Sequence, residues 1–131
     1  MRTLTLMILA GVAILPAASS AKRDRLTDEQ RLEKALTGLQ PGKPVDCIEL
    51  RDAQGTEAFG DTLLFRSGRR LIYRNDAPGC DGGFAETFVT RTHGTRLCRG
   101  DVITKVDLQS GFQHGFCIAK SFTPYRAATA R

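Results

Sequence analysis

The sequence lacks the signatures on which metal sites and redox sites depend. It contains no C-x-x-C pair, and its four cysteines are 33, 18 and 19 residues apart. The cysteine ligands of zinc, in contrast, usually come in pairs roughly two to four residues apart. The same spacing argues against a catalytic dithiol. We therefore expect no metal and no cofactor.

A long hydrophobic run is also absent. The longest apolar stretch, residues 4–15, has 12 residues, whereas a helix that spans a membrane needs about 18 or more. It follows Arg2 and precedes Pro16 and a row of small residues that ends at Ala21, which is the layout of a secretory signal peptide. We expect residues 1–21 to be cleaved after Ala21, and a buried N-terminal helix is the alternative.

Groups that could form a catalytic site are few. The chain has two histidines, His93 and His114, both next to glycine in predicted turns, and it has no G-x-S-x-G nucleophile elbow. Acids that could form a glycosidase-type pair flank turns or strand ends, where carboxylates usually bond turn backbone. These acids are Asp76, Asp81, Glu86, Asp101 and Asp107. We expect a protein that is not an enzyme; a small hydrolase, with a histidine beside a carboxylate in a pocket, is an alternative.

The features that are present describe a small exported domain. Cleavage of the signal peptide would leave 110 residues, enough for one domain, with a net charge of +4. That charge favours anionic surfaces, but the cations are too dispersed for a nucleic-acid interface. An oxidising compartment and an even number of cysteines predict two disulfides. The spacing leaves open all three pairings of Cys47, Cys80, Cys98 and Cys117.

Residues 22–44 are predicted to form a helical N-terminal segment and a linker. A capping box at residues 27–30 begins a helix over 28–37. Apolar residues at positions 32, 35, 36 and 39 form one stripe, and Pro41 and Pro44 prevent the helix from continuing. A helix of this length is unstable alone in water, so it must dock, on its own sheet or on a partner.

Residues 45–126 are predicted to form the β domain. Six stretches with strand-like composition are bounded by turn formers, and they span residues 45–51, 61–66, 70–74, 84–92, 101–107 and 115–120. Residues 53–60 are predicted to be a polar loop and residues 127–131 a disordered tail. The expected fold is mainly β, a small antiparallel barrel or sandwich of about six strands with one short N-terminal helix and two disulfides.

Short motifs in this part of the chain resemble a known group of sequences. They are residues 42–48 (GKPVDCI), 71–75 (LIYRN), 97–101 (LCRGD), 110–112 (SGF) and 122–126 (FTPYR). On these motifs the chain resembles a family of small exported proteins of alphaproteobacteria, of the sphingomonad type, to which no activity is assigned. The resemblance covers about residues 35–126. It implies a Gram-negative envelope, hence the periplasm, and the pairing Cys47–Cys98 and Cys80–Cys117.

A basic hairpin is the most suggestive surface feature. Arg66, Arg69, Arg70 and Arg74 cluster around a predicted turn. Guanidinium groups bind phosphate and carboxylate in bidentate fashion, so this cluster is a candidate site for anions. The alternative is that these charges protect the strand pair from aggregation.

Residues 99–101 spell Arg-Gly-Asp, the tripeptide that integrins recognise. We interpret them as a turn in which Gly100 adopts a positive φ angle and Asp101 caps the backbone. An adhesive role is the alternative.

Together these features predict a non-enzymatic periplasmic binding or accessory protein, or a secreted one if the cell is not Gram-negative. Its expected partner is an anionic envelope component, a lipid headgroup or peptidoglycan, or a periplasmic protein. The rival function is inhibition of a secreted hydrolase, since such inhibitors are also small and disulfide-bonded. A charge of +4 fits an acidic enzyme better than a basic lysozyme.

Overall fold

The computed structural model describes residues 25–83 and 85–128. The predicted signal peptide and the last residues of the predicted tail lie outside these ranges. The described chain contains one α-helix, one 3-10 helix and ten strands, which are α1 (Asp28–Leu36), β1 (Leu39–Pro41), β2 (Cys47–Glu49), η1 (Leu50–Asp52), β3 (Gly55–Phe59), β4 (Thr62–Ser67), β5 (Leu71–Asp76), β6 (Glu86–Thr90), β7 (Arg96–Cys98), β8 (Val102–Asp107), β9 (Gln113–Ile118) and β10 (Phe122–Ala127).

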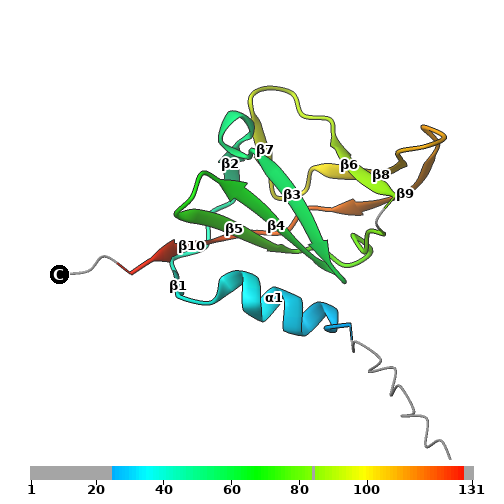
Figure 1. Cartoon of the computed structure of the whole chain (residues 1–131). Coiled ribbons are helices and arrows are strands. Elements are labelled where there is room, and N and C mark those ends of the chain that lie inside the picture. Colours follow the sequence, from blue (N-terminus) through cyan, green and yellow to red (C-terminus); the bar gives the residue numbers. More distant parts are fainter. Residues whose placement is uncertain (1–24, 84, 129–131) are drawn as a thin grey trace, which may run out of the picture.

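The strands form a sandwich. A five-stranded sheet in the order β1-β10-β5-β4-β3 lies in the middle of the molecule, and every pairing within it is antiparallel. Helix α1 covers one of its faces (Figure 1). The other face packs against a two-stranded sheet, β2-β7, and a three-stranded sheet, β6-β8-β9. The prediction of a mainly β, antiparallel fold is confirmed, in its sandwich form.

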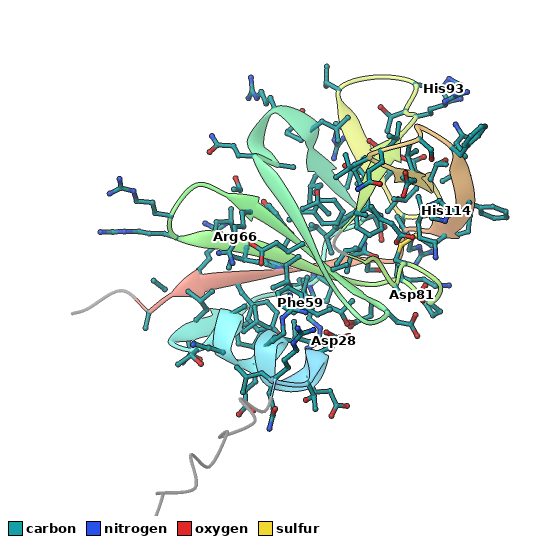
Figure 2. All side chains as sticks on the ribbon, turned by 45° about the vertical axis from the view of Figure 1, so that its right-hand side comes forward. Asp28, Phe59, Arg66, Asp81, His93 and His114 are labelled. Atoms are coloured by element: carbon teal, nitrogen blue, oxygen red, sulfur yellow. A yellow bond between two sulfur atoms is a disulfide. The ribbon has the colours of Figure 1, made fainter. Side chains whose placement is uncertain are left out.

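Helix α1 begins where the capping box predicts. The Thr27 hydroxyl accepts the Gln30 N–H at 3.3 Å, and the Gln30 side chain accepts the Thr27 N–H at 2.9 Å. The helix ends before Gly38, whose φ is 78°. Its apolar stripe packs on Phe59, Leu64 and Ile72 of the central sheet (Figure 2). The helix therefore docks on its own domain, which the sequence had left open.

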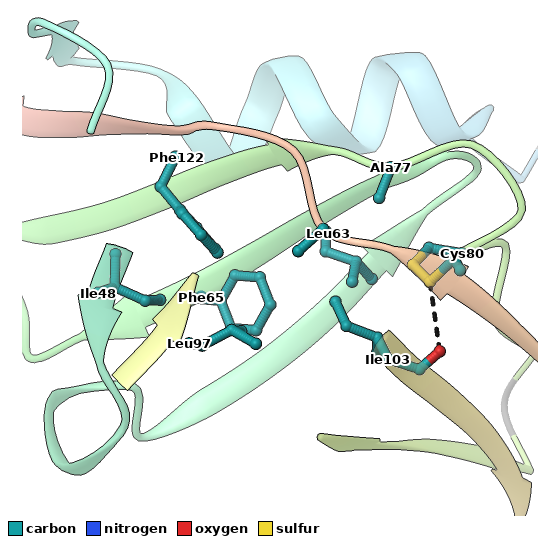
Figure 3. Close-up of a cluster of buried hydrophobic side chains, with 10 residues drawn as sticks. Ile48, Leu63, Phe65, Ala77, Cys80, Leu97, Ile103 and Phe122 are labelled. Carbon is teal, nitrogen blue, oxygen red and sulfur yellow. Dashed lines mark hydrogen bonds between the residues drawn. A yellow bond between two sulfur atoms is a disulfide. The ribbon is translucent and has the colours of Figure 1, made fainter. Parts of the chain in front are cut away.

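The main core lies between the central sheet and the two smaller sheets. Leu63, Phe65 and Phe122 project from the central sheet and meet Leu97 and Ile103 from the opposite layer (Figure 3). The rings of Phe65 and Phe122 contact edge to face, with centroids 5.7 Å apart. Each such fully buried side chain stabilises the fold by about 1.5–3 kcal/mol.

Both disulfides form with the pairing that the family resemblance implies. Cys47 and Cys98 are directly opposite each other in the β2-β7 pair. Cys80 and Cys117 join the loop at 77–83 to β9, and both are buried. Two disulfides in a domain of this size are typical of proteins that fold outside the cytoplasm. In the ranges that the structure describes, no helix has the length and hydropathy of a membrane span.

The structure corrects two local predictions. The described residues contain ten strands and not about six, and residues 53–60 are not a loop, because they contain β3. Gly60, with φ of 56°, and Asp61 form the two-residue turn to β4. β3 lies at the edge of its sheet and is largely exposed, so its composition is that of a polar loop.

Strand β10 was missed for a different reason. It contains Pro124 but lies between β1 and β5, where proline is usually excluded because it cannot donate to the ladder. The Pro124 carbonyl accepts the N–H of Gly42 at 2.7 Å. The proline nitrogen thus faces Gly42, just past the end of β1, and the ladder between β10 and β5 is not interrupted. The last residue of β10 is Ala127, so regular structure extends into the predicted tail by one residue.

Candidate functional site

The structure divides the four arginines of the β4-β5 hairpin into two pairs. Arg66 Nε donates to Glu57 at 2.7 Å, and Arg74 Nε donates to Asp76 at 2.9 Å. Arg69 and Arg70 lie in the exposed turn, and neither forms an ion pair within the described chain. At most the two turn arginines are therefore available to an external anion, and anion binding by the hairpin stays a prediction.

Arg74 is held between the sheet and the helix. It lines a groove of about 420 Å³ with Glu29, Leu32 and Glu33 of α1. Partial burial lowers the pKa of its guanidinium, but hydrogen bonds and charge interactions with Asp76 and Tyr125 outweigh burial and raise the pKa above its ordinary value. Arg74 is thus part of the helix-to-sheet contact.

Each histidine either shares a pocket with a carboxylate or lies beside one. His93 lines a pocket of about 400 Å³ with Asp101, but Asp101 Oδ2 accepts the N–H of Cys98 at 2.7 Å. His114 Nε2 lies 3.4 Å from Glu86 Oε1. All four cysteines are in disulfides, and among the described residues no hydroxyl hydrogen-bonds to either imidazole. Catalysis by either histidine stays a prediction.

The Arg-Gly-Asp turn has the conformation that the sequence predicts. Gly100 has a φ of 96°, and the Asp101 carboxylate caps the Cys98 N–H. This aspartate is partly buried and its carboxylate is engaged with the backbone of its own turn. The turn is therefore a structural element that connects β7 to β8.

The orientation of β8 leaves apolar side chains on the solvent side. Ile103 and Lys105 face the interior, while Val102, Thr104 and Val106 face outward. Lys105 is accommodated because its Nζ reaches the Asp81 carboxylate at 3.0 Å and the Asp81 carbonyl at 3.3 Å. This ion pair holds the pKa of Asp81 below its ordinary value. Gly115 lies opposite Lys105 and leaves room for its stem.

The outward side of the three-stranded sheet carries no charge at its paired positions. The pairing places Val89 beside Thr104 and Thr104 beside Phe116. The complete set of outward residues is Thr87, Val89, Val102, Thr104, Val106, Gln113, Phe116 and Ile118. We call this set the outer face. An antiparallel sheet with one solvated side normally alternates apolar-in with polar-out, so the uncharged outer face is a candidate interaction surface.

Two further apolar side chains are exposed at the adjacent hairpin tip. Phe116 is 67% exposed, and Leu108 and Phe112 in the β8–β9 turn are 63% and 73% exposed. The turn itself is ordered by Asp107, whose carboxylate accepts the N–H groups of Gln109 and Ser110. These bonds, chiefly the one from the Ser110 N–H, hold the pKa of Asp107 below its ordinary value.

Cations lie at the opposite end of the outer face. Arg91 follows Val89 by two residues and Lys120 follows Ile118 by two residues, so each continues the outward side of its strand. Both are exposed, and neither forms an ion pair within residues 25–83 and 85–128. The surface therefore combines exposed aromatic and aliphatic groups with positive charge that is not neutralised internally.

Sequence reasoning missed this surface, although one signal was present. In β8 and β9 apolar residues occupy both alternating sets of positions, as in the consecutive residues 116–118. Only one set can face the core of a two-layer sandwich. The surplus apolar set had to be exposed, but the sequence does not say which one.

A second concave feature lies between two sheet edges. A groove of about 590 Å³ is lined by residues 56–58 of β3 on one side and 86–88 of β6 on the other. Gly82 and Gly83, and Asp28 and Arg31 of α1, also line it.

Comparisons with family models, with curated proteins and with solved structures find no match for this chain. A functional proposal must therefore be derived from the surface chemistry of the domain.

Proposed function

We propose that this protein is a non-enzymatic exported binding protein that attaches to anionic membrane surfaces through its outer face. The observations that carry the proposal are the uncharged outer face and the exposed Leu108 and Phe112 at the adjacent hairpin tip. Exposed aromatic and aliphatic side chains partition into the boundary between headgroups and acyl chains. The two disulfides agree with an extracytoplasmic location.

Charge supports an anionic surface over a neutral one. The chain has a net charge of +5, and Arg91 and Lys120 at the border of the outer face have no internal ion-pair partner in the described chain. A cation near an anionic bilayer contributes about 1 kcal/mol. Burial of a phenylalanine side chain contributes about 1.5–3 kcal/mol when complete. Two partly inserted phenylalanines and two cations are together sufficient for reversible attachment.

The experiment compares sedimentation with vesicles of phosphatidylcholine alone and vesicles that also contain phosphatidylglycerol. We expect wild-type protein to bind the anionic vesicles more tightly, and Phe112→Ser/Phe116→Ser to lose about tenfold or more in affinity. Arg91→Ser/Lys120→Ser should lose a similar factor on anionic vesicles only. Val45→Ser removes an exposed apolar side chain from a different surface and is the matched control.

Two results would contradict the proposal. One is equal affinity of wild type and Phe112→Ser/Phe116→Ser for anionic vesicles. The other is loss of binding in Arg69→Ser/Arg70→Ser alone, which would assign the anion site to the β4-β5 turn, as the sequence predicts.

The second candidate function is inhibition of a secreted hydrolase, and the order of the β8–β9 turn favours it. Asp107 holds this turn through three acceptor contacts, with the Gln109 N–H, the Ser110 N–H and the Ser110 hydroxyl. An inhibitor loop gains affinity from such preorganisation. Capture of an acidic hydrolase from periplasmic extract, lost in Phe112→Ser, would support inhibition in place of membrane attachment.

A further inference from the structure

We propose that the groove between β3 and β6 binds an extended basic peptide segment of a partner protein, which adds to the free edge of β3 as a further strand. The groove and the outer face have Thr87 in common, but the inference does not depend on membrane attachment.

The edges of the two larger sheets are not equally protected. The β1 edge carries Pro41, and the β9 edge is covered by the loop at 77–83, which the Cys80–Cys117 disulfide fixes there. Gly79 in this loop lies close to the carbonyl oxygen of Phe116. The other two edges, β3 and β6, contain neither proline nor lysine, the usual devices against strand addition. Both of these edges line the same groove.

The register shows which backbone groups of β3 face the groove. Phe59 and Thr62 flank a two-residue turn and are paired, so they exchange hydrogen bonds across the hairpin. Because the bonding side alternates along an antiparallel strand, Thr56 and Ala58 direct their N–H and C=O groups away from β4. These are the groups that an added strand would bond.

The opposite wall offers an apolar surface and some backbone. Ala85 and Leu108 are bonded across the β6–β8 pair, the Leu108 N–H donating to the Ala85 carbonyl. By the same alternation Phe88 directs its backbone toward the free edge of β6. The Phe88 ring lies against Gly82, where an added Cβ would come within 2.6 Å of the ring. The groove is therefore bounded by a ring and a glycine on the side facing β3.

The charge of the groove selects a basic occupant. Three acids, Asp28, Glu57 and Glu86, line it beside a single cation, Arg31, in a chain whose net charge is +5. Asp28 is paired with Arg31 at 2.9 Å and Glu57 with Arg66 at 2.7 Å, so Glu86 is the acid that is open to a ligand. Glu86 accepts the Gly83 N–H at 2.9 Å and lies near His114, but no lysine or arginine of the described residues pairs with it. A lysine or arginine of the bound strand would form an ion pair with this carboxylate.

Proline at position 56 tests the backbone contact directly. Thr56→Pro removes a donor that faces the groove and leaves the bonds between β3 and β4 in place. The preceding residue is Gly55, which lacks the Cβ that normally conflicts with a following proline. Thr56→Val keeps the N–H and removes only the hydroxyl, so it is the matched control. Glu86→Gln removes the charge at nearly constant shape.

The probe is a capped ten-residue peptide that alternates lysine with valine, titrated into the disulfide-bonded ¹⁵N-labelled domain. We expect the amide signals of β3 and of Phe88 to shift, with a Kd at or below about 1 mM. Affinity should fall about tenfold in Thr56→Pro, and severalfold in Glu86→Gln, while Thr56→Val binds as wild type. A peptide that alternates glutamate with valine should bind at least about tenfold more weakly.

Three results would overturn the inference. They are shifts confined to other strands, equal binding of the lysine and glutamate peptides, and a dimer of this chain, seen by ultracentrifugation, that Thr56→Pro abolishes. The last would make a second copy the occupant. If Thr56→Pro does not fold, a lysine peptide with alternate amides N-methylated replaces it. Methylation of the peptide amides that face β3 should reduce affinity about tenfold. Undiminished binding of this methylated peptide would contradict strand addition.

Discussion

The side-chain amide of Asn75 forms two hydrogen bonds with the backbone of Lys120. Its Nδ2 donates to the Lys120 carbonyl at 2.7 Å, and its Oδ1 accepts the Lys120 N–H at 2.9 Å. Asn75 is completely buried, and Lys120 lies where the chain passes from β9 into β10 (Figure 1). One side chain of the central sheet therefore supplies the backbone partners that the chain lacks where it crosses between the two layers.

Asn75→Ala tests this bond pair. The substitution leaves the N–H and the carbonyl of Lys120 without partners at a part-buried position, and an unsatisfied buried group costs about 1–3 kcal/mol. We expect the free energy of unfolding in urea to fall by roughly 2–4 kcal/mol. Gln113→Ala, an exposed amide in β9, is the control and should change stability by less than about 0.5 kcal/mol. A loss at position 75 no larger than the control would show that the two bonds add no net stability.

The two disulfides should contribute comparably to stability. They join residues 51 and 37 positions apart in sequence, and the chain-entropy relation assigns about 3.5–4.5 kcal/mol to loops of this size. We expect Cys47→Ala/Cys98→Ala and Cys80→Ala/Cys117→Ala each to lower the free energy of unfolding by about that amount. Urea titration of each pair variant measures it. A reduced wild-type protein that unfolds at the same urea concentration as the oxidised protein would contradict the expectation.

Gly82 and Gly83 should respond differently to alanine. An added Cβ at Gly82 would lie 2.6 Å from the Phe88 ring and 3.3 Å from the Ala58 side chain, whereas nothing lies within 4 Å of one at Gly83. Both rings and methyl groups resist displacement in a packed layer. We expect Gly82→Ala to cost about 1–3 kcal/mol and Gly83→Ala less than about 0.5 kcal/mol, measured by urea unfolding. Equal losses of stability in the two variants would mean that the Phe88 ring moves aside without cost.

The Asp81–Lys105 pair predicts a pH dependence. The hydrogen bond and charge of Lys105 hold the pKa of Asp81 below its ordinary value of 3.8. A carboxylate with a depressed folded-state pKa stabilises the fold above its unfolded pKa, and this contribution is lost as pH falls through the folded value. Asp81→Asn should therefore lower stability at pH 7 and weaken its decline below about pH 4.

The effect at Asp81 should be small, because the carboxylate is largely exposed and solvent screens it. Asp46→Asn makes the same charge change at another exposed carboxylate, 3.9 Å from Arg99, and is the control. Stability is measured by urea unfolding between about pH 2 and pH 7. Identical pH profiles of wild type and Asp81→Asn would show that the pair does not contribute.

Local signals predicted the helix and the strongest strands well. The capping box and the stripe act within one or two turns, so the sequence alone shows their effect. Strands were missed where their partners are distant or where their own composition is polar. β1 and β10 pair with each other across more than 80 residues, and β3 is stabilised by β4 despite its polar composition. Pairing of this kind depends on tertiary context more than on propensity.

The candidate site was predictable only in part. The sequence identified the hairpin arginines, but it did not show which of them are free to bind an external anion. Glu57 and Asp76 reach Arg66 and Arg74 only when the strands are in register. In β8 the interior position of Lys105 depends on Asp81, 24 residues earlier in the chain. With Lys105 inside, the valines of that strand are outside, and the outer face follows.

By itself, the amino-acid sequence determined the composition of this protein's elements: a short capped helix, antiparallel strands and four cysteines able to form two bridges. These properties follow from interactions between residues that are near one another along the chain. The tertiary structure decided which side of each strand is buried, which arginines are neutralised and which sheet edges stay open. Those outcomes depend on the strand partners and the packing layers, and the side chains that set them meet only in the folded domain.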